Sequence, residues 1–227
     1  MGLPSQNDGV NLGALKPSTT WGEYNQIAFI IQQSLSKIQT ATLVQVVACS
    51  NSGGVSAVGT VDIQPLVNQI DGGDNPIPHL TVYNVPYLRI QGGLNAVIID
   101  PQPGDIGIAI FASRDITKVK STKAQGNPGS YRQFDFADAL YLGGLLNGVP
   151  QQYVELASSG ITLNTSGTIT LNGSSIVLNG PVSQSGGNVT IAQNLTVSGD
   201  ATASGTSLHT HIHSGVQSGA STSGKPV

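Results

Sequence analysis

The sequence predicts a mainly β protein, in which an N-terminal helix and an OB-like Greek-key barrel precede an intertwined triple-stranded β-helix with a metal-capped C-terminal apex. Two observations favour β structure. Only 9% of the 227 residues are charged, against about a quarter in an average soluble domain, so hydroxyl and amide side chains must supply solubility. Glycine occurs 29 times, and short β-branched runs are separated by Gly, Asn and Pro turn signals. A third observation divides the chain: every aromatic residue lies before residue 156, so a conventional core is expected only there.

We expect four segments along the chain: an arm with a helix at 1–39, the barrel at 40–154, the β-helix spike at 155–208 and the metal-binding apex at 209–227. The net charge of −3 offers no basic stripe, so no nucleic-acid partner is expected. Cys49 is the only cysteine, which excludes an intrachain disulfide and agrees with folding in a reducing cytoplasm. The first ten residues lack a secretion signal, and no apolar run approaches the roughly 18 residues of a membrane span. We therefore expect the chain to be made as a soluble protein.

The stretch KPSTTWGEYNQIAFIIQQSLSKIQT predicts a helix over 20–38. Thr20 as N-cap and Glu23 three residues later form a capping box. An apolar stripe follows at helical spacing, made of Ile27, Ile30, Ile31, Leu35 and Ile38. We expect this stripe to dock on its own domain or on a neighbouring subunit, because the polar face carries Gln and Ser rather than the Lys and Arg of a membrane-surface helix.

Five short strands are expected in the barrel, divided by turns such as SNSGG, DGGDNPIP and PQPGD. Their number and spacing suit a small Greek-key barrel of the OB type. The strand candidates are TATLVQVVACS, VSAVGTVDIQPL, HLTVYNVPYLRIQ, NAVIIDPQ and DIGIAIFAS. In the mixed segment that follows, Phe134, Phe136 and Leu140 are expected to pack onto the barrel, and Cys49 is expected to be a buried structural thiol.

Residues 156–227 follow a different pattern, with no aromatic residue and only two charged ones, Asp200 and Lys225. Short units each carry two aliphatic residues two positions apart, and Asn, Gly or Ser then marks a turn. The pairs are Ile161/Leu163, Ile169/Leu171, Ile176/Leu178, Val189/Ile191 and Leu195/Val197.

One chain of such units cannot bury a core, because two small aliphatic residues per unit do not offset roughly 1–2 kcal/mol of backbone entropy per residue. A single-chain solenoid is disfavoured, since its turns normally need about twenty residues. Disorder is the competing interpretation, but disordered segments rarely keep aliphatic residues in strict alternation. We therefore expect three chains to wind around a shared axial core as a homotrimer.

Three of the four histidines, His209, His211 and His213, alternate near the C-terminus, so a continuing strand would place them on one face. On a three-fold axis, two successive histidines would bring six imidazoles together. Six nitrogen donors suit iron, with nickel as the next fit, and do not suit tetrahedral zinc. An accidental histidine-rich tract is the competing interpretation, and His79, beside prolines, is expected to be structural.

The stretch HIHSGVQSGASTSGKP is similar to the C-terminal tip of the central spike proteins of contractile-tailed bacteriophages and related bacteriocin particles. Their signature is His-x-His, a small residue or two and Val, and then a Gly/Ser/Thr-rich end that finishes in Gly-x-Pro. YRQFDFADAL is a weaker local match. The resemblance implies that His211 and His213 of three chains hold one iron ion. His209 departs from the minimal pattern: it either supports the ligands, or the pair is His209 with His211.

The resemblance also implies a function: a structural spike at the distal tip of the virion's tail, which is made in the host cytoplasm and pierces the host outer membrane. Tail or baseplate hub proteins are expected to bind the N-terminal zone. The alternative is a trimeric fibre tip that binds a receptor or glycan, although the tip has no aromatic or acidic patch to hold a sugar. No enzymatic activity is expected, because the tail has no Glu, and its only acid, Asp200, lies well before the histidines. Asp135 and Asp138 are expected to serve turns or helix starts.

Overall fold

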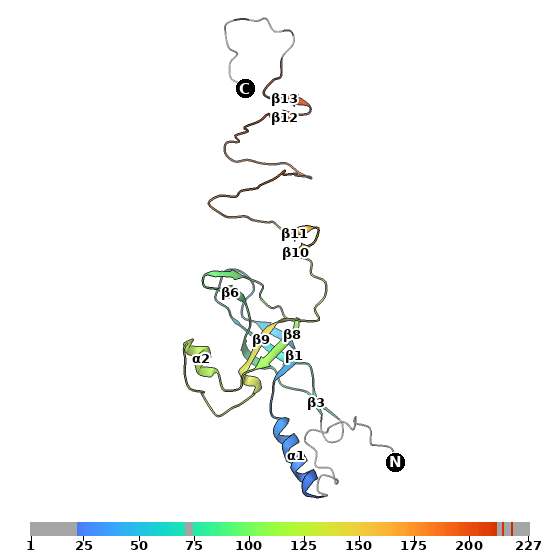
Figure 1. Cartoon of the computed structure of the whole chain (residues 1–227), viewed down its shortest axis with the longest axis vertical. Coiled ribbons are helices and arrows are strands. Elements are labelled where there is room, and N and C mark those ends of the chain that lie inside the picture. Colours follow the sequence, from blue (N-terminus) through green and yellow to red (C-terminus); the bar gives the residue numbers. More distant parts are fainter. Residues whose placement is uncertain (1–21, 71–74, 213–214, 216–218, 220–227) are drawn as a thin grey trace, which may run out of the picture. The chain divides into compact units, whose positions relative to one another are not determined.

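The structure is a computed structural model that describes residues 22–70, 75–212, 215 and 219. It divides into two compact units, Met1–Ser166 and Gly167–Val227. Among the described residues, no helix is long and apolar enough to cross a membrane. Figure 1 shows the order of the elements along the chain, with labels on most of them.

A five-stranded antiparallel sheet with the order β5-β2-β1-β8-β9 forms the centre of the first unit. Its strands are β1 (Ala41–Cys49), β2 (Thr60–Pro65), β5 (Val82–Pro86), β8 (Ile106–Phe111) and β9 (Ala139–Gly144). In β2 and β8 every second residue is buried, as expected for strands that have one face on a core. The mainly β prediction is confirmed.

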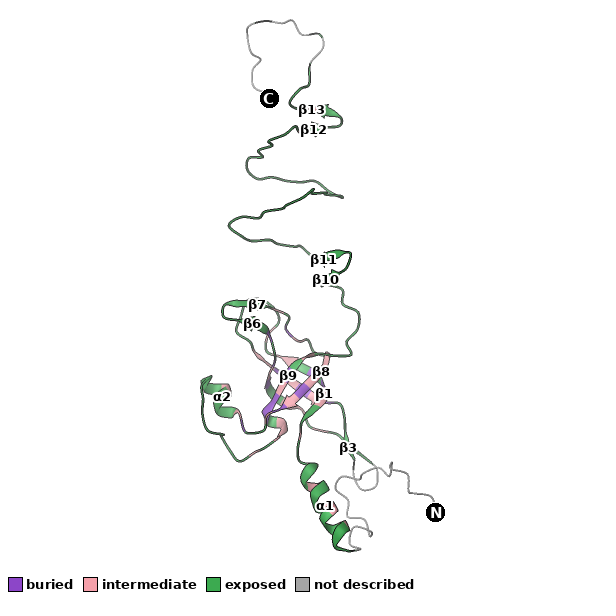
Figure 2. Ribbon diagram, in the orientation of Figure 1, coloured by how far each residue is buried: buried purple, intermediate pink, exposed green. Residues whose placement is uncertain are grey.

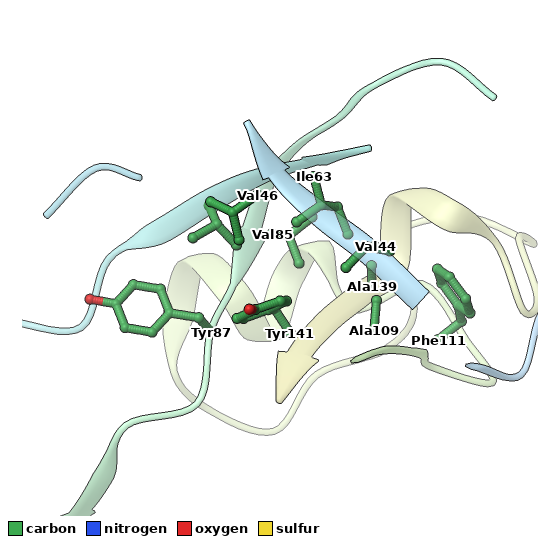
Figure 3. Packing of buried hydrophobic residues seen from close by; sticks show 10 residues of the cluster. Val44, Val46, Ile63, Val85, Tyr87, Ala109, Phe111, Ala139 and Tyr141 are labelled. Atoms are coloured by element: carbon green, nitrogen blue, oxygen red, sulfur yellow. The ribbon is translucent and has the colours of Figure 1, made fainter. Parts of the chain in front are cut away.

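The sheet curls so that its two edge strands meet. Tyr87, just after β5, forms a parallel bridge with Tyr141 of β9, and the Leu88 N–H donates to the Tyr141 carbonyl at 2.8 Å. The core inside this curl combines valine-rich strands with two tyrosines and one phenylalanine (Figure 3). Its members are Val44, Val46, Val61, Ile63, Val85, Tyr87, Ala109, Phe111, Ala139 and Tyr141. Gly107 is required in β8, because a Cβ there would collide with the Gly143 carbonyl and the Tyr141 hydroxyl.

The prediction of a sheet strand at 95–102 is wrong. Only Asn95–Val97 is a strand there (β7), and it pairs with β6 (Ile90–Gly92) in a separate hairpin. Asp100 lies outside the strand, and its carboxylate forms a buried ion pair with Arg89. The fifth strand of the sheet is instead β9, from the segment that the sequence left as mixed.

The expectation that Phe136 packs onto the barrel is confirmed. Phe136 packs against the core, where its ring meets that of Phe111 edge-on at 4.9 Å. Phe134 and Leu140 are half-buried. The prediction that Cys49 is a buried thiol is wrong: the residue contacts the core but is only partly buried.

Helix α1 is Glu23–Leu35, so it begins later and ends earlier than predicted. The capping box is wrong: Gly22 is the N-cap, and it makes no side-chain cap bond. Thr20 lies outside the described residues. No residue of α1 is buried, and its apolar stripe is exposed (Figure 2).

A buried ion pair ties the loop before β8 to the segment after β5. Arg89 Nη2 lies 2.6 Å from Asp100 Oδ1, and these side chains are only 2% and 1% exposed. The Tyr87 hydroxyl donates to the same oxygen at 2.6 Å, and the Gly53 N–H donates to Oδ2 at 3.0 Å. The hydrogen bond from Tyr87, followed by that from Arg89, lowers the pKa of Asp100. These contacts keep the carboxylate ionised inside the protein.

A second ion-pair network stabilises the long connection between β8 and β9, which contains α2 (Thr117–Thr122). Arg132 donates to both carboxylate oxygens of Asp138 at 3.1 Å, and it lies 3.1 Å from Asp115 Oδ2. Asp138 also accepts from the Ile116 N–H. The expected turn role holds for Asp135, whose carboxylate accepts from the Ala137 N–H and caps the short 3-10 helix Phe136–Asp138.

Acid is expected to destabilise this unit, starting below about pH 4. Hydrogen bonds from Ser130 and Thr117, and then the charge of Arg132, hold the pKa of Asp115 far below its ordinary value. A carboxyl with a lowered folded-state pKa stabilises the fold above its unfolded pKa of about 3.9, and this contribution is lost as the pH falls. Thermal unfolding measured from pH 7 to pH 2 should therefore have a steady midpoint down to about pH 5 and a falling one below pH 4.

Asp115→Asn is the matched variant for this measurement. Its midpoint should be lower than that of the wild type at pH 7 and should fall less on acidification. An acid dependence equal to that of the wild type would exclude Asp115 as a source of the effect.

A hairpin of β10 (Tyr153–Ala157) and β11 (Gly160–Asn164) closes the first unit. From 167 to 199, where every residue is described, the chain forms neither helix nor strand. The four aliphatic pairs of this stretch are exposed by 46% to 68% in a single chain (Figure 2).

Candidate metal-binding apex

The apex begins with a two-stranded hairpin of β12 (Thr202–Ala203) and β13 (Thr206–Ser207). Ser204 and Gly205 form its two-residue loop, with φ values of 51° and 85°. Positive φ at both positions is the requirement of a type I′ turn, whose twist matches that of the paired strands. The hairpin brings Ser207 back toward Asp200 and Ala201, and the Leu208 N–H donates to the Ala201 carbonyl at 2.8 Å.

A tight turn at 208–210 follows, and Ser207 is at its centre. The Ser207 hydroxyl oxygen accepts from the Thr210 N–H at 2.9 Å and from the His209 N–H at 3.2 Å. The His209 N–H also lies 3.2 Å from Asp200 Oδ1. The hydrogen bond from the Ser207 side chain, followed by that from the His209 backbone, lowers the pKa of Asp200.

His211 is bound to the same turn through its backbone and its ring. Its N–H donates to the Ser207 carbonyl at 3.2 Å, and its Nδ1 lies 3.1 Å from that oxygen. A carbonyl oxygen only accepts, so the short contact requires a proton on Nδ1. In the neutral ring, Nε2 then carries the lone pair with which histidine binds metals.

The structure describes two of the three candidate histidines. His209 and the residue after it lie in the turn, so a strand does not run through 208–210 as the alternation argument assumed. His213 lies outside the described residues, as does most of the stretch that follows it. Among the described residues of this single chain, no group of three or more His, Cys, Asp or Glu is placed to hold a metal ion.

Asp200 lies just before the apex hairpin, and the sequence did not indicate its role there. Its position, nine residues before His209, gave no sign of contact, yet the hairpin brings the carboxylate to the His209 backbone. The available signal was composition: Asp200 is the only acidic residue after Glu155. His79 has the expected structural place, since its ring lies 4.7 Å from that of Phe136.

Comparison with known proteins identifies this end of the chain. A family model described as "Apex: GpV Apex motif" matches residues 205–227, a range that includes all three candidate histidines. No curated protein matches the chain. The resemblance noted from the sequence is therefore confirmed at this end of the chain: residues 205–227 match the apex motif of GpV-type spikes, which supports a phage tail spike protein.

Proposed function

We propose that the protein is a homotrimeric spike at the distal tip of a contractile phage tail, where it pierces the host outer membrane during injection. The observation that carries the proposal is the exposure of the alternating aliphatic pairs directly before the apex motif. A single chain leaves Ile169, Leu171, Ile176 and Leu178 between 51% and 67% exposed. The chain therefore keeps an apolar surface for a partner to cover.

Identical chains are the partners that fit this surface. Each pair presents two aliphatic side chains and then a turn, so three copies can place equivalent pairs around one axis. Burying a valine, leucine or isoleucine contributes roughly 1.5–3 kcal/mol relative to exposure, and the four pairs from 169 to 197 repeat this gain along the axis in each chain. Winding the chains together would also supply the strand partners that a single copy does not have.

The first unit is suited to an OB-type barrel at the base of such a spike. Its pairing places β1 beside β2 and β8, with β5 beside β2 and β9 beside β8. The bridge between Tyr87 and Tyr141 joins the remaining edges, β5 and β9, in parallel. This cyclic order, with a single parallel contact, supports a closed five-stranded Greek-key barrel.

The donor set of the apex fits one iron ion held by His211 and His213 of three chains. The contact between His211 Nδ1 and the Ser207 carbonyl favours the Nδ1–H tautomer, in which Nε2 is the nitrogen that binds a metal. Two histidines from each of three chains supply six imidazole nitrogens, which suits six-coordinate iron. When bound, the ion would cross-link three chain ends that would otherwise fray, and its binding free energy would stabilise the assembly.

The composition of the spike suits passage through a membrane. Between 156 and 227 the chain carries one acidic and one basic residue, Asp200 and Lys225, so little charge has to lose its hydration in lipid. Interwound chains expose few free strand edges. We propose a structural role without catalysis, with the exposed stripe of α1 available to tail or baseplate hub proteins.

Counting chains tests the proposal directly. Sedimentation equilibrium of the full chain should give three times the 23.2 kDa mass of one chain. A monomer at micromolar concentration would contradict the proposed trimeric spike. A selective partner in a glycan-binding screen would instead favour the receptor-binding fibre tip.

The metal assignment predicts about one iron per three chains in elemental analysis of chelator-washed protein. The double variant His211→Ala with His213→Ala should lose this iron and remain a trimer, because the aliphatic pairs hold the chains together. Its apex should melt at a lower temperature than that of the wild type, which protease digestion during heating would detect. One zinc per chain, or iron retained by the double variant, would contradict the assignment.

A further inference from the structure

We propose that Asp200 and Ser207 are positioning residues for the metal-binding histidines: together they fix the turn that holds His211 in its Nδ1–H tautomer and so present Nε2 to the metal. The inference rests on the proposed metal site. It adds two residues that are not themselves ligands and assigns a function to Asp200, the only acidic residue after Glu155.

The Ser207 hydroxyl donates one hydrogen bond, and its direction decides how the turn is held. A serine hydroxyl has one proton to donate and two lone pairs that accept. A carboxylate oxygen of Asp200 accepts in the hydrogen bond between these side chains, so this bond takes the Ser207 proton. The lone pairs of Ser207 then remain for the N–H groups of His209 and Thr210, at 3.2 and 2.9 Å. Asp200 thereby determines that the Ser207 hydroxyl accepts, rather than donates, the hydrogen bonds within the turn.

A second contact of Asp200 strengthens the same turn. Its Oδ1 lies 3.2 Å from the His209 N–H, which is therefore shared between the carboxylate and the Ser207 hydroxyl. The Thr210 Oγ1 also lies 2.9 Å from the Ser207 hydroxyl oxygen. Side chains that satisfy the backbone N–H groups of a turn hold it in one conformation, because those groups would otherwise have to pair with water.

The Ser207 carbonyl connects this turn to the His211 ring. It accepts from the His211 N–H at 3.2 Å, and His211 Nδ1 lies 3.1 Å away on the same oxygen. A carbonyl held in this place fixes both the tautomer and the plane of the imidazole. Metal-binding histidines typically have such a partner on their second nitrogen, and its loss costs roughly 10–100-fold in metal affinity.

His211 belongs to both ligand pairs that the sequence left open, His211 with His213 and His209 with His211. The positioning of its ring therefore applies in either register. His209 makes its bonds to the turn through its backbone N–H.

The first test reads the tautomer without metal. Full-length protein labelled with ¹⁵N in its histidines and stripped with a chelator should give a His211 signal of the Nδ1–H form, assigned by its disappearance in His211→Gln. Ser207→Ala and Asp200→Ala should move this signal toward a mixture of tautomers. Ser207→Thr keeps a hydroxyl and should restore the wild-type signal. Ser198→Ala, outside the turn, is the matched control and should change nothing.

The second test measures affinity for Fe²⁺, by anaerobic competition with a chelator, on samples confirmed as trimers. Asp200→Ala and Ser207→Ala should bind Fe²⁺ roughly 10–100-fold more weakly, and Ser207→Thr should recover most of the loss. Asp200→Asn should fall between wild type and Asp200→Ala, because the amide keeps an accepting oxygen and loses the charge.

Two results would overturn the inference: a wild-type His211 in the Nε2–H form, or alanine variants with unchanged tautomer and unchanged affinity. Wild-type protein that binds no Fe²⁺ would instead remove the proposed iron site. The tautomer measurement would still decide whether Asp200 and Ser207 position His211, so the two failures are distinguishable.

Discussion

Replacing Ile169 with aspartate is expected to abolish the trimer. Ile169 and Leu171 form one of the pairs that a single chain leaves exposed, by 51% and 61%. In the proposed spike this pair lies on the axis, so Ile169→Asp would bring three carboxylates together in an apolar core. The effective penalty for burying an ion is several kcal/mol each, and like charges at close range add to it. Sedimentation equilibrium should detect monomers at concentrations at which the wild type is trimeric.

Thr170→Asp is the matched control, since it adds the same charge one residue along. Successive residues of a strand point to opposite faces, so this carboxylate would face water and the trimer should persist. Equal effects of the two substitutions would show that charge alone, and not an axial apolar face, controls assembly. An intact trimer in Ile169→Asp would remove the shared core from the proposal.

Asp100→Ala is expected to destabilise the first unit by about 3–5 kcal/mol, the usual cost of removing one partner of a buried ion pair. Arg89 would keep its charge in a site where its side chain is only 2% exposed. The hydrogen bonds from the Tyr87 hydroxyl and the Gly53 N–H would also be lost. Urea unfolding of the full chain, followed by tyrosine fluorescence of the core, measures the change.

The exposed Glu155 provides a control, because Glu155→Ala removes a carboxylate from a residue at the surface and should have little effect. The double variant Arg89→Met with Asp100→Leu should be less destabilised than Asp100→Ala, since it removes both charges. A loss below about 1 kcal/mol in Asp100→Ala would mean that the ion pair contributes little to the fold.

Strand prediction succeeded in β2, where one face of the strand is apolar, and failed in β9, where both faces are. The buried residues of β2, Val61 and Ile63, alternate with the polar residues Asp62 and Gln64, so the period was visible. In β9 the buried Ala139 and Tyr141 alternate with Leu140 and Leu142. No alternation marked this strand, although it forms one edge of the sheet. Nor could the sequence exclude 98–102, because the pairing of Asp100 with Arg89 depends on how the loop folds.

At the apex, the residue types were enough to predict the motif, but the local backbone conformation could not be predicted from the sequence. The histidines and the Gly/Ser/Thr-rich end indicated the motif that the comparison confirmed. The alternation of His209 and His211 predicted a strand, yet the chain turns at 208–210, because Ser207 offers both its hydroxyl and its carbonyl to the N–H groups that follow. Asp200 escaped notice because only the hairpin brings it to His209.

By itself, the sequence determined the β character, the segments in which a core can form and the identity of the apex, because these depend on which residues are present and on their period. The tertiary structure alone decided which strands close the sheet, where helix α1 begins and which side chains hold the apex turn. Those outcomes depend on contacts between residues far apart in the chain. A buried carboxylate or a serine hydroxyl can form its hydrogen bonds only after the backbone has brought the donor and acceptor groups together.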